Sequence, residues 1–353
     1  MLIVVALPLF PAIKWLEKDY DFGKFHETDG PTTGTSRFVN LGPETISIFH
    51  VRPSCGCTSA DYTKDPIAPG DTAVIQYTYD PVDRPGSFDK TVRVTLSDGV
   101  NQIIKIKGTI IGTPESLAYR YPVNAGNLLL SDAFIDLGEM KKGRTPMKFL
   151  RGYSVAKDSV APSISTDSPA VSLKQDTTII GEGDVVTFTV NFDSRIMQEY
   201  GPFEIPLTVN MPVASNAGAT LDPSDQTIIM LRGIILPDPY PFIMEQKGKS
   251  PAIELNSTTI DLGEIGDAKF DTWFTVTNTG KSDLEILRVY SACKAFNFGE
   301  LPKPVKPGKT ASVKITVDPQ LLNAGPQQQS IEILTNDPNR THLSIPVALF
   351  YRE

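Results

Sequence analysis

The chain has 353 residues, of which 40% are hydrophobic and 21% charged, and its formal net charge is −8. A chain of this length is too long to fold around one ordinary hydrophobic core, and the composition is typical of globular rather than disordered chains. Acidic and basic residues are mixed without a lysine- or arginine-rich run, which argues against nucleic acid as a partner and against adsorption to anionic membranes.

The first segment, residues 2–12, is an apolar run of the length found in secretory signal peptides, although no basic region precedes it. It is too short to span a bilayer. A buried strand is the alternative interpretation, but Pro8 and Pro11 disfavour a central strand. We therefore favour a truncated export signal, with residues 1–16 as its remnant and cleavage near Ala12.

The body of the chain after residue 16 contains no apolar stretch long enough to span a membrane. We expect no transmembrane segment in the mature chain and a location in the periplasm or cell envelope. An exported chain would lie in an oxidising compartment.

Three short stretches resemble one another: "YDFGKF" at 20–25, "IDLGEM" at 135–140 and "IDLGEI" at 260–265. Each reads apolar, Asp, apolar, Gly, charged, apolar. This pattern predicts a first strand with a glycine kink, followed by a turn. The spacing of the three copies predicts three repeated units.

Further strands are predicted where apolar residues alternate after each of these stretches. The first copy has such segments at 36–42 and 67–81, and the third copy has matching segments at 274–280 and 305–319. The middle copy has one counterpart, at 181–193. The pattern indicates about seven strands in a unit of about 100 residues, with no sustained helical period.

Short strands at this spacing, separated by turn residues, are typical of immunoglobulin-like antiparallel β-sandwiches. We predict an all-β protein with three such domains in tandem, over residues 17–113, 125–237 and 250–353. The segments 112–127 and 237–250 are rich in Pro, Gly and Tyr. We predict that they are linkers whose aromatic side chains pack at the domain joints.

Two of the three cysteines, Cys55 and Cys57, flank one glycine, and the offset between copies one and three aligns Cys55 with Cys293. Three interpretations remain open. The sulfurs could pack as small apolar groups at a turn, or form a disulfide across Gly56. They could also bind Cu(I) or form half of a zinc site, with His50 as the nearest further ligand in the sequence.

The first copy resembles the bacterial domain-of-unknown-function family fifteen-seventy-three, which is common in exported proteins of Bacteroidetes. The resemblance rests on Asp21-Phe22-Gly23, Phe38 to Gly42, Val51 to Thr58, Ile67 to Gly70 and Gly108. Such domains resemble the immunoglobulin-like modules of Hydin-type and major-sperm-protein-type proteins. The resemblance implies export and a sandwich fold, and it implies no settled activity.

The sequence contains no nucleophile elbow, zinc-protease helix motif or phosphate-binding loop. We therefore predict that the protein is not an enzyme and has no cofactor. The best candidate surface for a partner is the motif loop, residues 53–66, which contains Tyr62, Lys64 and both cysteines and is preceded by Arg52.

These features together predict an exported, non-enzymatic interaction or scaffold protein of the bacterial cell envelope. Its expected partner is a protein or another envelope component. The alternative is a periplasmic thiol-redox or copper-binding protein that uses Cys55 and Cys57.

Overall fold

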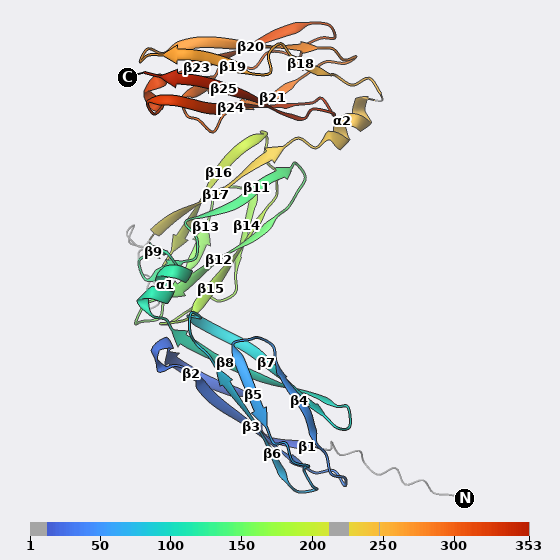
Figure 1. Ribbon diagram of the computed structural model, residues 1–353, viewed down its shortest axis with the longest axis vertical. Coiled ribbons are helices and arrows are strands. Elements are labelled where there is room, and N and C mark those ends of the chain that lie inside the picture. The colour runs from blue at the N-terminus through green and yellow to red at the C-terminus, as the bar shows by residue number, and fades with distance from the viewer. Residues whose placement is uncertain (1–12, 212–225, 247, 353) are drawn as a thin grey trace, which may run out of the picture.

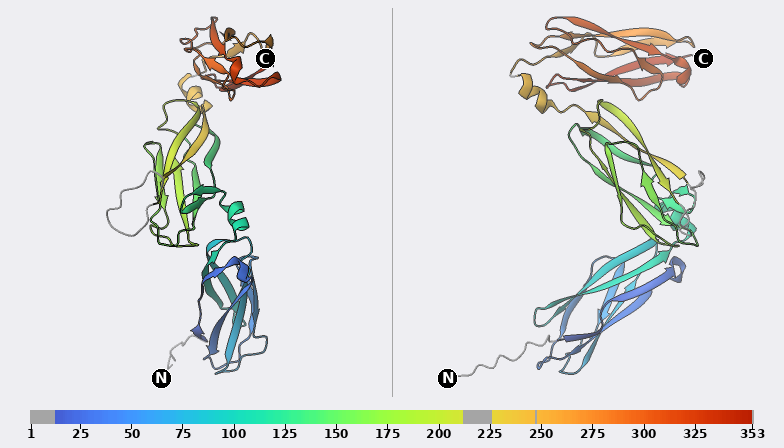
Figure 2. Two further views of the ribbon diagram at one scale, coloured as in Figure 1. Left: turned by 90° about the vertical axis from the view of Figure 1, so that its left-hand side faces the viewer. Right: turned by 180° about the vertical axis from the view of Figure 1, so that it is seen from behind.

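The computed structural model describes residues 13–211, 226–246 and 248–352, and it consists of three β-sandwiches that follow one another along the chain (Figure 1). Figure 2 shows the same succession from two further sides. Two short helices lie between the sandwiches, α1 (Pro114–Arg120) and α2 (Pro239–Gln246). The predicted export signal before Ile13 lies outside the described residues.

Domain 1 packs two four-stranded sheets, with the strand orders β1-β3-β6-β5 and β2-β8-β7-β4. A short 3-10 helix, η1 (Glu27–Asp29), follows the second strand. The strands are β1 (Ile13–Glu17), β2 (Tyr20–His26), β3 (Thr32–Asn40), β4 (Ile48–Pro53), β5 (Thr58–Tyr62), β6 (Thr72–Tyr79), β7 (Gly86–Leu96) and β8 (Asn101–Ile111).

Domain 2 packs a five-stranded sheet, β14-β15-β12-β10-β9, against a four-stranded sheet, β11-β17-β16-β13. The strands are β9 (Val123–Ala125), β10 (Leu128–Leu130), β11 (Phe134–Lys141), β12 (Met147–Ser154), β13 (Ser163–Ser165), β14 (Val171–Gln175), β15 (Val185–Phe192), β16 (Gly201–Asn210) and β17 (Gln226–Leu236).

Domain 3 repeats the arrangement of domain 1, with the sheets β18-β20-β23-β22 and β19-β25-β24-β21. A second 3-10 helix, η3 (Pro319–Leu321), precedes the last hairpin. The strands are β18 (Ile253–Leu255), β19 (Ile260–Ile265), β20 (Phe270–Asn278), β21 (Ile286–Tyr290), β22 (Phe296–Phe298), β23 (Thr310–Val317), β24 (Gly325–Thr335) and β25 (His342–Tyr351).

The repeated Asp-x-Gly stretch forms the same β-bulge in every domain. One carboxylate oxygen of the aspartate accepts a hydrogen bond from the N–H of the glycine two residues on, and the glycine has a positive φ of 64° to 67°. Glycine adopts this left-handed conformation without the steric cost that a Cβ atom brings. The residue pairs are Asp21–Gly23, Asp136–Gly138 and Asp261–Gly263.

The strand that carries this bulge runs parallel to the last strand of its domain: β2 to β8, β11 to β17 and β19 to β25. The other strand pairs in the described residues are antiparallel, so the parallel pair is the single departure from the predicted pairing in each domain. The alternation of apolar residues determines which face of a strand is buried, but it carries no information about strand direction.

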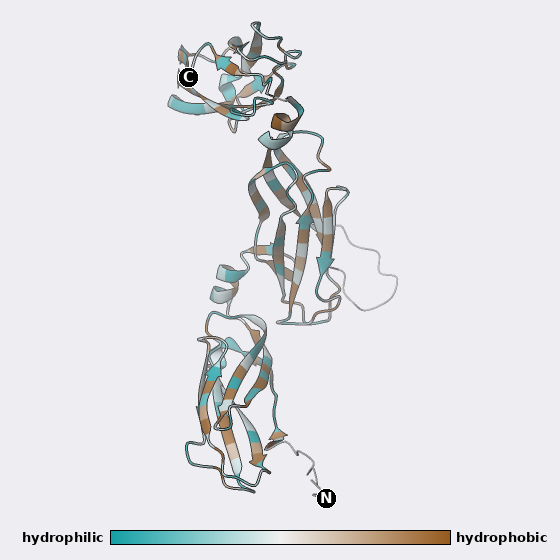
Figure 3. Ribbon diagram, turned by 90° about the vertical axis from the view of Figure 1, so that its right-hand side faces the viewer, coloured by the Kyte–Doolittle hydropathy of each residue, from teal (hydrophilic) through white to brown (hydrophobic). Residues whose placement is uncertain are grey.

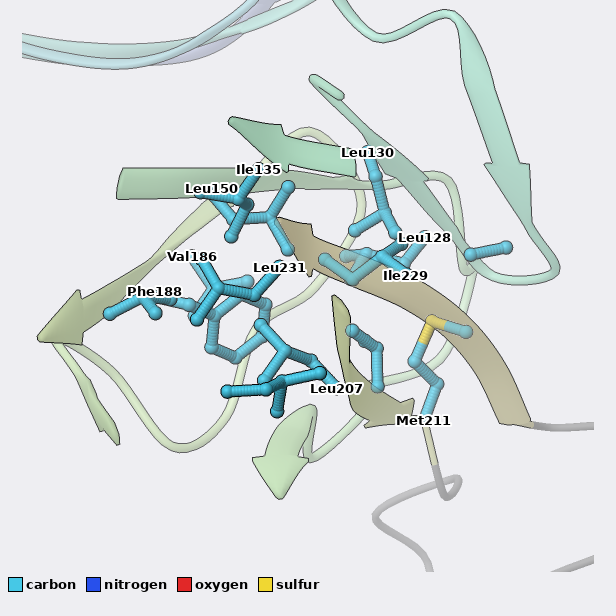
Figure 4. Close-up of a cluster of buried hydrophobic side chains, with 14 of the residues drawn as sticks. Leu128, Leu130, Ile135, Leu150, Val186, Phe188, Leu207, Met211, Ile229 and Leu231 are labelled. Carbon is cyan, nitrogen blue, oxygen red and sulfur yellow. The ribbon is translucent and has the colours of Figure 1, made fainter. Parts of the chain in front are cut away.

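Each sandwich has its own hydrophobic core between its sheets. Apolar and polar residues alternate along the strands, as the bands in Figure 3 show. In domain 2 the buried side chains of the two sheets interdigitate, among them Leu150 and Phe188 from one sheet and Leu207 and Leu231 from the other (Figure 4). Burial of this apolar surface is the main favourable contribution to folding.

Domain 1 begins earlier than the predicted boundary at residue 17. β1 pairs with β3 from Ile13 onward, and the Ile13 side chain is buried. The ring of Trp15 packs edge-on against Phe38, with the ring centroids 5.3 Å apart. Residues 13–16 are therefore part of a sheet rather than of a signal-peptide remnant, whereas the predicted cleavage near Ala12 would leave this strand intact.

The two segments predicted as linkers contain the helices α1 and α2, although the sequence shows no sustained helical period there. α1 begins at Pro114, and the Thr113 side chain caps it by accepting a hydrogen bond from the Ser116 N–H at 3.2 Å. Tyr121, just after α1, is buried, whereas Tyr119 is exposed.

Candidate functional site

The Cys-Gly-Cys stretch forms the loop that carries the chain from one sheet of domain 1 to the other. β4 ends before it at Pro53, and β5 begins after it at Thr58. Cys55 and Cys57 form a disulfide, in which Cys57 is buried and Cys55 half-buried. The Asp80 N–H donates to the Cys57 carbonyl at 2.9 Å, which anchors the loop at the end of β6.

An aromatic cluster supports the disulfide from inside domain 1. The rings of Tyr79 and Phe88 stack with centroids 3.9 Å apart and planes 7° from parallel. Cys57 belongs to the same buried cluster, and Phe22, Phe25 and Cys55 pack against it. The stacked rings form the apolar wall on which the disulfide packs.

The predicted partner-binding residues are only partly brought together. The Lys64 ammonium lies 3.3 Å from the centre of the Tyr62 ring, and the Tyr62 hydroxyl donates to the Phe49 carbonyl at 3.1 Å. Arg52 lies instead on β4, directly opposite Arg93 of β7. The stretch predicted as one long loop is partly a strand, because Tyr62 is the last residue of β5.

A buried carboxylate, Glu27, fixes the linker helix α1 to domain 1. One of its oxygens accepts from the Asp83 N–H at 2.7 Å. The other accepts from the Thr113 N–H at 3.0 Å and from the Ser116 hydroxyl at 2.5 Å. Hydrogen bonds to a charged acceptor are stronger than those between neutral groups, so this side chain ties two loops together at the start of α1.

Domains 1 and 2 also contact each other directly. The hydroxyl of buried Tyr153 in domain 2 accepts from the Gly112 N–H at 3.1 Å and donates to the Ile110 carbonyl at 3.4 Å. On domain 1, the Lys24 ammonium donates to the Glu182 carbonyl at 2.7 Å. Hydrogen bonds from Tyr153 and Lys24 therefore join the two domains at this joint.

A cavity of about 740 Å³ lies at this joint and is lined by both domains. Domain 1 contributes the disulfide and the stacked pair of Tyr79 and Phe88. The segment that includes α1 contributes Arg120, and domain 2 contributes Ser131 and Arg151. The Cys-Gly-Cys loop therefore lines an open cavity to which both domains contribute.

The charged side chains around this cavity are mostly cationic. Asp83 supplies the single carboxylate among its lining residues, and the cations are Arg84, Lys90, Arg120 and Arg151. Arg84 lies 3.7 Å from the Asp80 carboxylate, a residue outside the lining. The other three cations form no ion pair with any residue in the described part of the chain.

Two of these cations, Arg120 and Arg151, lie close enough to the buried Tyr121 side chain to affect its pKa. Burial raises the pKa of the Tyr121 phenol, while the nearby guanidinium groups of Arg151 and Arg120 partly oppose this increase because they favour the charged phenolate. Arg120 also donates from Nε to the Asp83 carbonyl at 3.2 Å.

The corresponding loop of domain 3 keeps the backbone arrangement and lacks the disulfide. The Asp318 N–H donates to the Ala295 carbonyl at 2.8 Å, as Asp80 does to Cys57 in domain 1. Ala295 is fully buried, and Cys293 is a half-buried free thiol. The predicted alignment of the two copies therefore describes a position of the fold, while the dithiol chemistry belongs to domain 1.

Among the described residues, no three histidine, cysteine, aspartate or glutamate side chains gather in a way that could hold a metal ion. The imidazole of His50, the nearest candidate for a further ligand in the sequence, lies 3.4 Å from the Thr95 hydroxyl. No helix in the same part of the chain has the length and apolar character needed to cross a membrane. The copper and redox roles of Cys55 and Cys57 stay predictions.

A comparison with family models identifies the protein family that domain 1 matches. Residues 13–110 match DUF1573, a family of proteins of unknown function. The resemblance predicted from the Asp-x-Gly and Cys-Gly-Cys stretches is thus confirmed for the DUF1573 domain. Residues 251–348 match the HYDIN/CFA65/VesB-like, Ig-like domain, and the immunoglobulin-like fold is confirmed with it.

Several solved structures are similar to parts of the chain. A protein of unknown function from Porphyromonas gingivalis has 18% identity and a TM-score of 0.49, covering 64% of this chain and 100% of its own. The secreted serine protease VesC from Vibrio cholerae has 11% identity and a TM-score of 0.28, covering 62% of this chain and 50% of its own. Drosophila N-cadherin EC1-4 has 11% identity and a TM-score of 0.23, with coverages of 97% and 76%. The search of the curated proteins found no match.

The residues that build the joint were not singled out from the sequence. Glu27 looks like an ordinary acidic residue in a charged turn, and the four cations of the cavity are scattered between residues 84 and 151. One available signal was the sequence Thr113-Pro114-Glu115, an N-cap followed by Pro and an acidic residue in the first turn, which predicts a helix start.

Proposed function

We propose that the protein is an exported, non-enzymatic interaction or scaffold protein of the bacterial cell envelope. The observation that carries this proposal is the succession of three sandwiches whose first joint is held by Glu27, Tyr153 and Lys24. A chain built in this way keeps its exposed strands and loops at defined relative positions, which suits the spacing or presentation of partners.

Two observations support the proposed location in the cell envelope and the proposed lack of catalytic activity. The match of residues 13–110 to DUF1573 agrees with the export that the resemblance implies, and the Cys55–Cys57 disulfide suits an oxidising compartment. Immunoglobulin-like sandwiches commonly act through edge strands and loops rather than through a catalytic cleft. The thiol-redox and copper alternatives rest on the same two sulfurs.

Fractionation of the native cells tests export directly. The expected result is a protein in the periplasmic or envelope fraction whose N-terminus lies close to residue 13 and whose Cys55 and Cys57 resist alkylation until a reductant is added. A cytoplasmic protein that keeps residues 2–12 and alkylates freely at both cysteines would refute the proposed location.

Site-specific cross-linking in intact cells tests the interaction role. A photo-reactive amino acid in place of Tyr62 is expected to cross-link a defined envelope component, because this residue lies where the edge strands β4 and β5 meet. The matched control places the same group at Tyr119, which is 78% exposed on α1. Equal cross-linking from both positions, or none from Tyr62, would argue against a partner at this edge.

A further inference from the structure

We propose that the cavity at the joint of domains 1 and 2 binds a small polyanion, which we define as a molecule with at least two carboxylate or phosphate groups on a compact body. This inference assigns a ligand class to the joint, and it holds whether or not the protein is exported or acts as a scaffold.

The charge around the cavity is opposite in sign to the charge of the whole chain. The protein has a formal net charge of −8, yet four cations and one carboxylate line this space. Lys90, Arg120 and Arg151 have no carboxylate partner among the described residues. Unpaired cations that converge on one space repel one another, and an anionic ligand removes that repulsion.

The three unpaired cations come from separate parts of the structure. Lys90 lies on β7 of domain 1, Arg120 ends α1, and Arg151 lies on β12 of domain 2. An arginine guanidinium presents a planar fork of N–H donors that matches a carboxylate or phosphate group. A ligand with several acid groups can engage cations on both sides of the joint, whereas a monovalent anion reaches only part of this set.

The remaining walls suit the body of such a ligand. Tyr79, Phe88 and the disulfide offer an apolar surface. The Ser87 hydroxyl, which lies 3.2 Å from the Thr109 hydroxyl, offers a hydrogen bond, whereas the Ser131 hydroxyl already donates to the Asp132 carboxylate. The volume of about 740 Å³ lies within the range of roughly 300–1,000 Å³ that is common for small-molecule sites.

The second joint shows that a basic cavity is not a general consequence of this fold. A cavity of about 690 Å³ there is lined by the acidic residues Asp136, Glu139 and Glu204 and by Arg232, together with Ala292 of domain 3. Arg232 is paired with Asp136 at 3.1 Å. The two cavities therefore differ in the sign of the charge on their lining residues, and the one cation that lines the second cavity is paired.

Isothermal titration of the full chain with citrate, inorganic pyrophosphate and acetate tests the proposal. We expect citrate or pyrophosphate to bind, acetate to show no binding over the same concentrations, and the affinity to fall as the salt concentration rises. The Arg151→Ala variant is expected to weaken binding about tenfold, because it removes one charged fork from the site. With the described residues the Arg151 side chain makes no hydrogen bond or ion pair, so this variant should fold normally.

The matched control is Arg37→Ala, which removes an exposed arginine from β3, on the same domain and outside the cavity lining. This variant is expected to bind as tightly as the unmodified protein. Lys90→Ala provides a second test within the cavity, with an expected loss of several-fold. The proposal is overturned if neither polyanion binds, or if the Arg37 variant loses as much affinity as the Arg151 and Lys90 variants.

Discussion

Replacement of Asn40 by alanine is expected to destabilise domain 1 by about 3 kcal/mol, because the Asn40 side chain is fully buried and completely hydrogen-bonded. Its amide nitrogen donates to the carbonyls of Glu44 at 2.8 Å and Ile67 at 2.9 Å, and its oxygen accepts from the Gly42 N–H at 3.0 Å. Alanine would leave these backbone groups without their partner and would open a small void.

The other two domains supply the matched comparison. Asn278 makes the same bonds in domain 3, to the carbonyls of Ser282 and Val305, both at 2.7 Å, so Asn278→Ala should cost domain 3 about as much. Ser154 occupies the corresponding position in domain 2, and its hydroxyl accepts one hydrogen bond, from the Ala156 N–H at 3.3 Å. Ser154→Ala is therefore expected to cost only about 1 kcal/mol.

Hydrogen exchange measured by mass spectrometry reports the stability of each domain within the full chain. The account predicts large losses of protection in domain 1 for the Asn40 variant and in domain 3 for the Asn278 variant, with a small loss in domain 2 for the Ser154 variant. Three equal effects, or a loss below about 1 kcal/mol for both asparagines, would show that these side chains do not organise the fold.

Replacement of Glu27 by alanine is expected to release α1 from domain 1. The variant leaves the N–H groups of Asp83 and Thr113 and the hydroxyl of Ser116 without their acceptor in a buried place. Loss of hydrogen bonds to a buried charged group costs about 2–4 kcal/mol in total. Because Asp83 has a left-handed backbone, with φ at 57°, its loop depends on such an external hydrogen bond.

Glu27→Gln is the control for this prediction. The amide keeps the shape of the side chain and one acceptor oxygen, so about half of the destabilisation should remain. The exchange rates of the Asp83 and Thr113 amides provide the measurement, and alanine should raise both by more than glutamine does. Unchanged protection of these two amides in the alanine variant would contradict the role assigned to Glu27.

The architecture follows closely from local patterns in the sequence. The Asp-x-Gly repeat predicts a kinked strand in every unit because an aspartate bond to the glycine N–H and a positive φ depend on adjacent residues alone. The prediction that this strand comes first in its unit was wrong, since β1, the pair β9 and β10, and β18 precede it in the three domains. Alternating apolar residues likewise predict the buried faces. The parallel pairing of β2 with β8 could not be predicted in this way, since it depends on which sheet edge of domain 1 the kinked strand joins.

Only part of the candidate site could be predicted from the sequence. Cys55 and Cys57 attract attention through their spacing, and the offset to Cys293 predicts their place in the fold. Their position at a cavity depends on how domain 2 sits on domain 1, and no local pattern encodes that contact. Arg120 and Arg151 approach one cavity through tertiary packing, although 31 residues separate them in the chain.

We infer that domains 1 and 2 form one stiff unit with the cavity at its joint. The most direct test measures the distance distribution between spin labels on the two domains by pulsed electron paramagnetic resonance. Labels at Asp98→Cys in domain 1 and Lys174→Cys in domain 2, in a Cys293→Ser background, use exposed positions outside the joint. The account predicts one narrow distance population, which broadens in the Glu27→Ala variant. A broad distribution in the unmodified joint would contradict it.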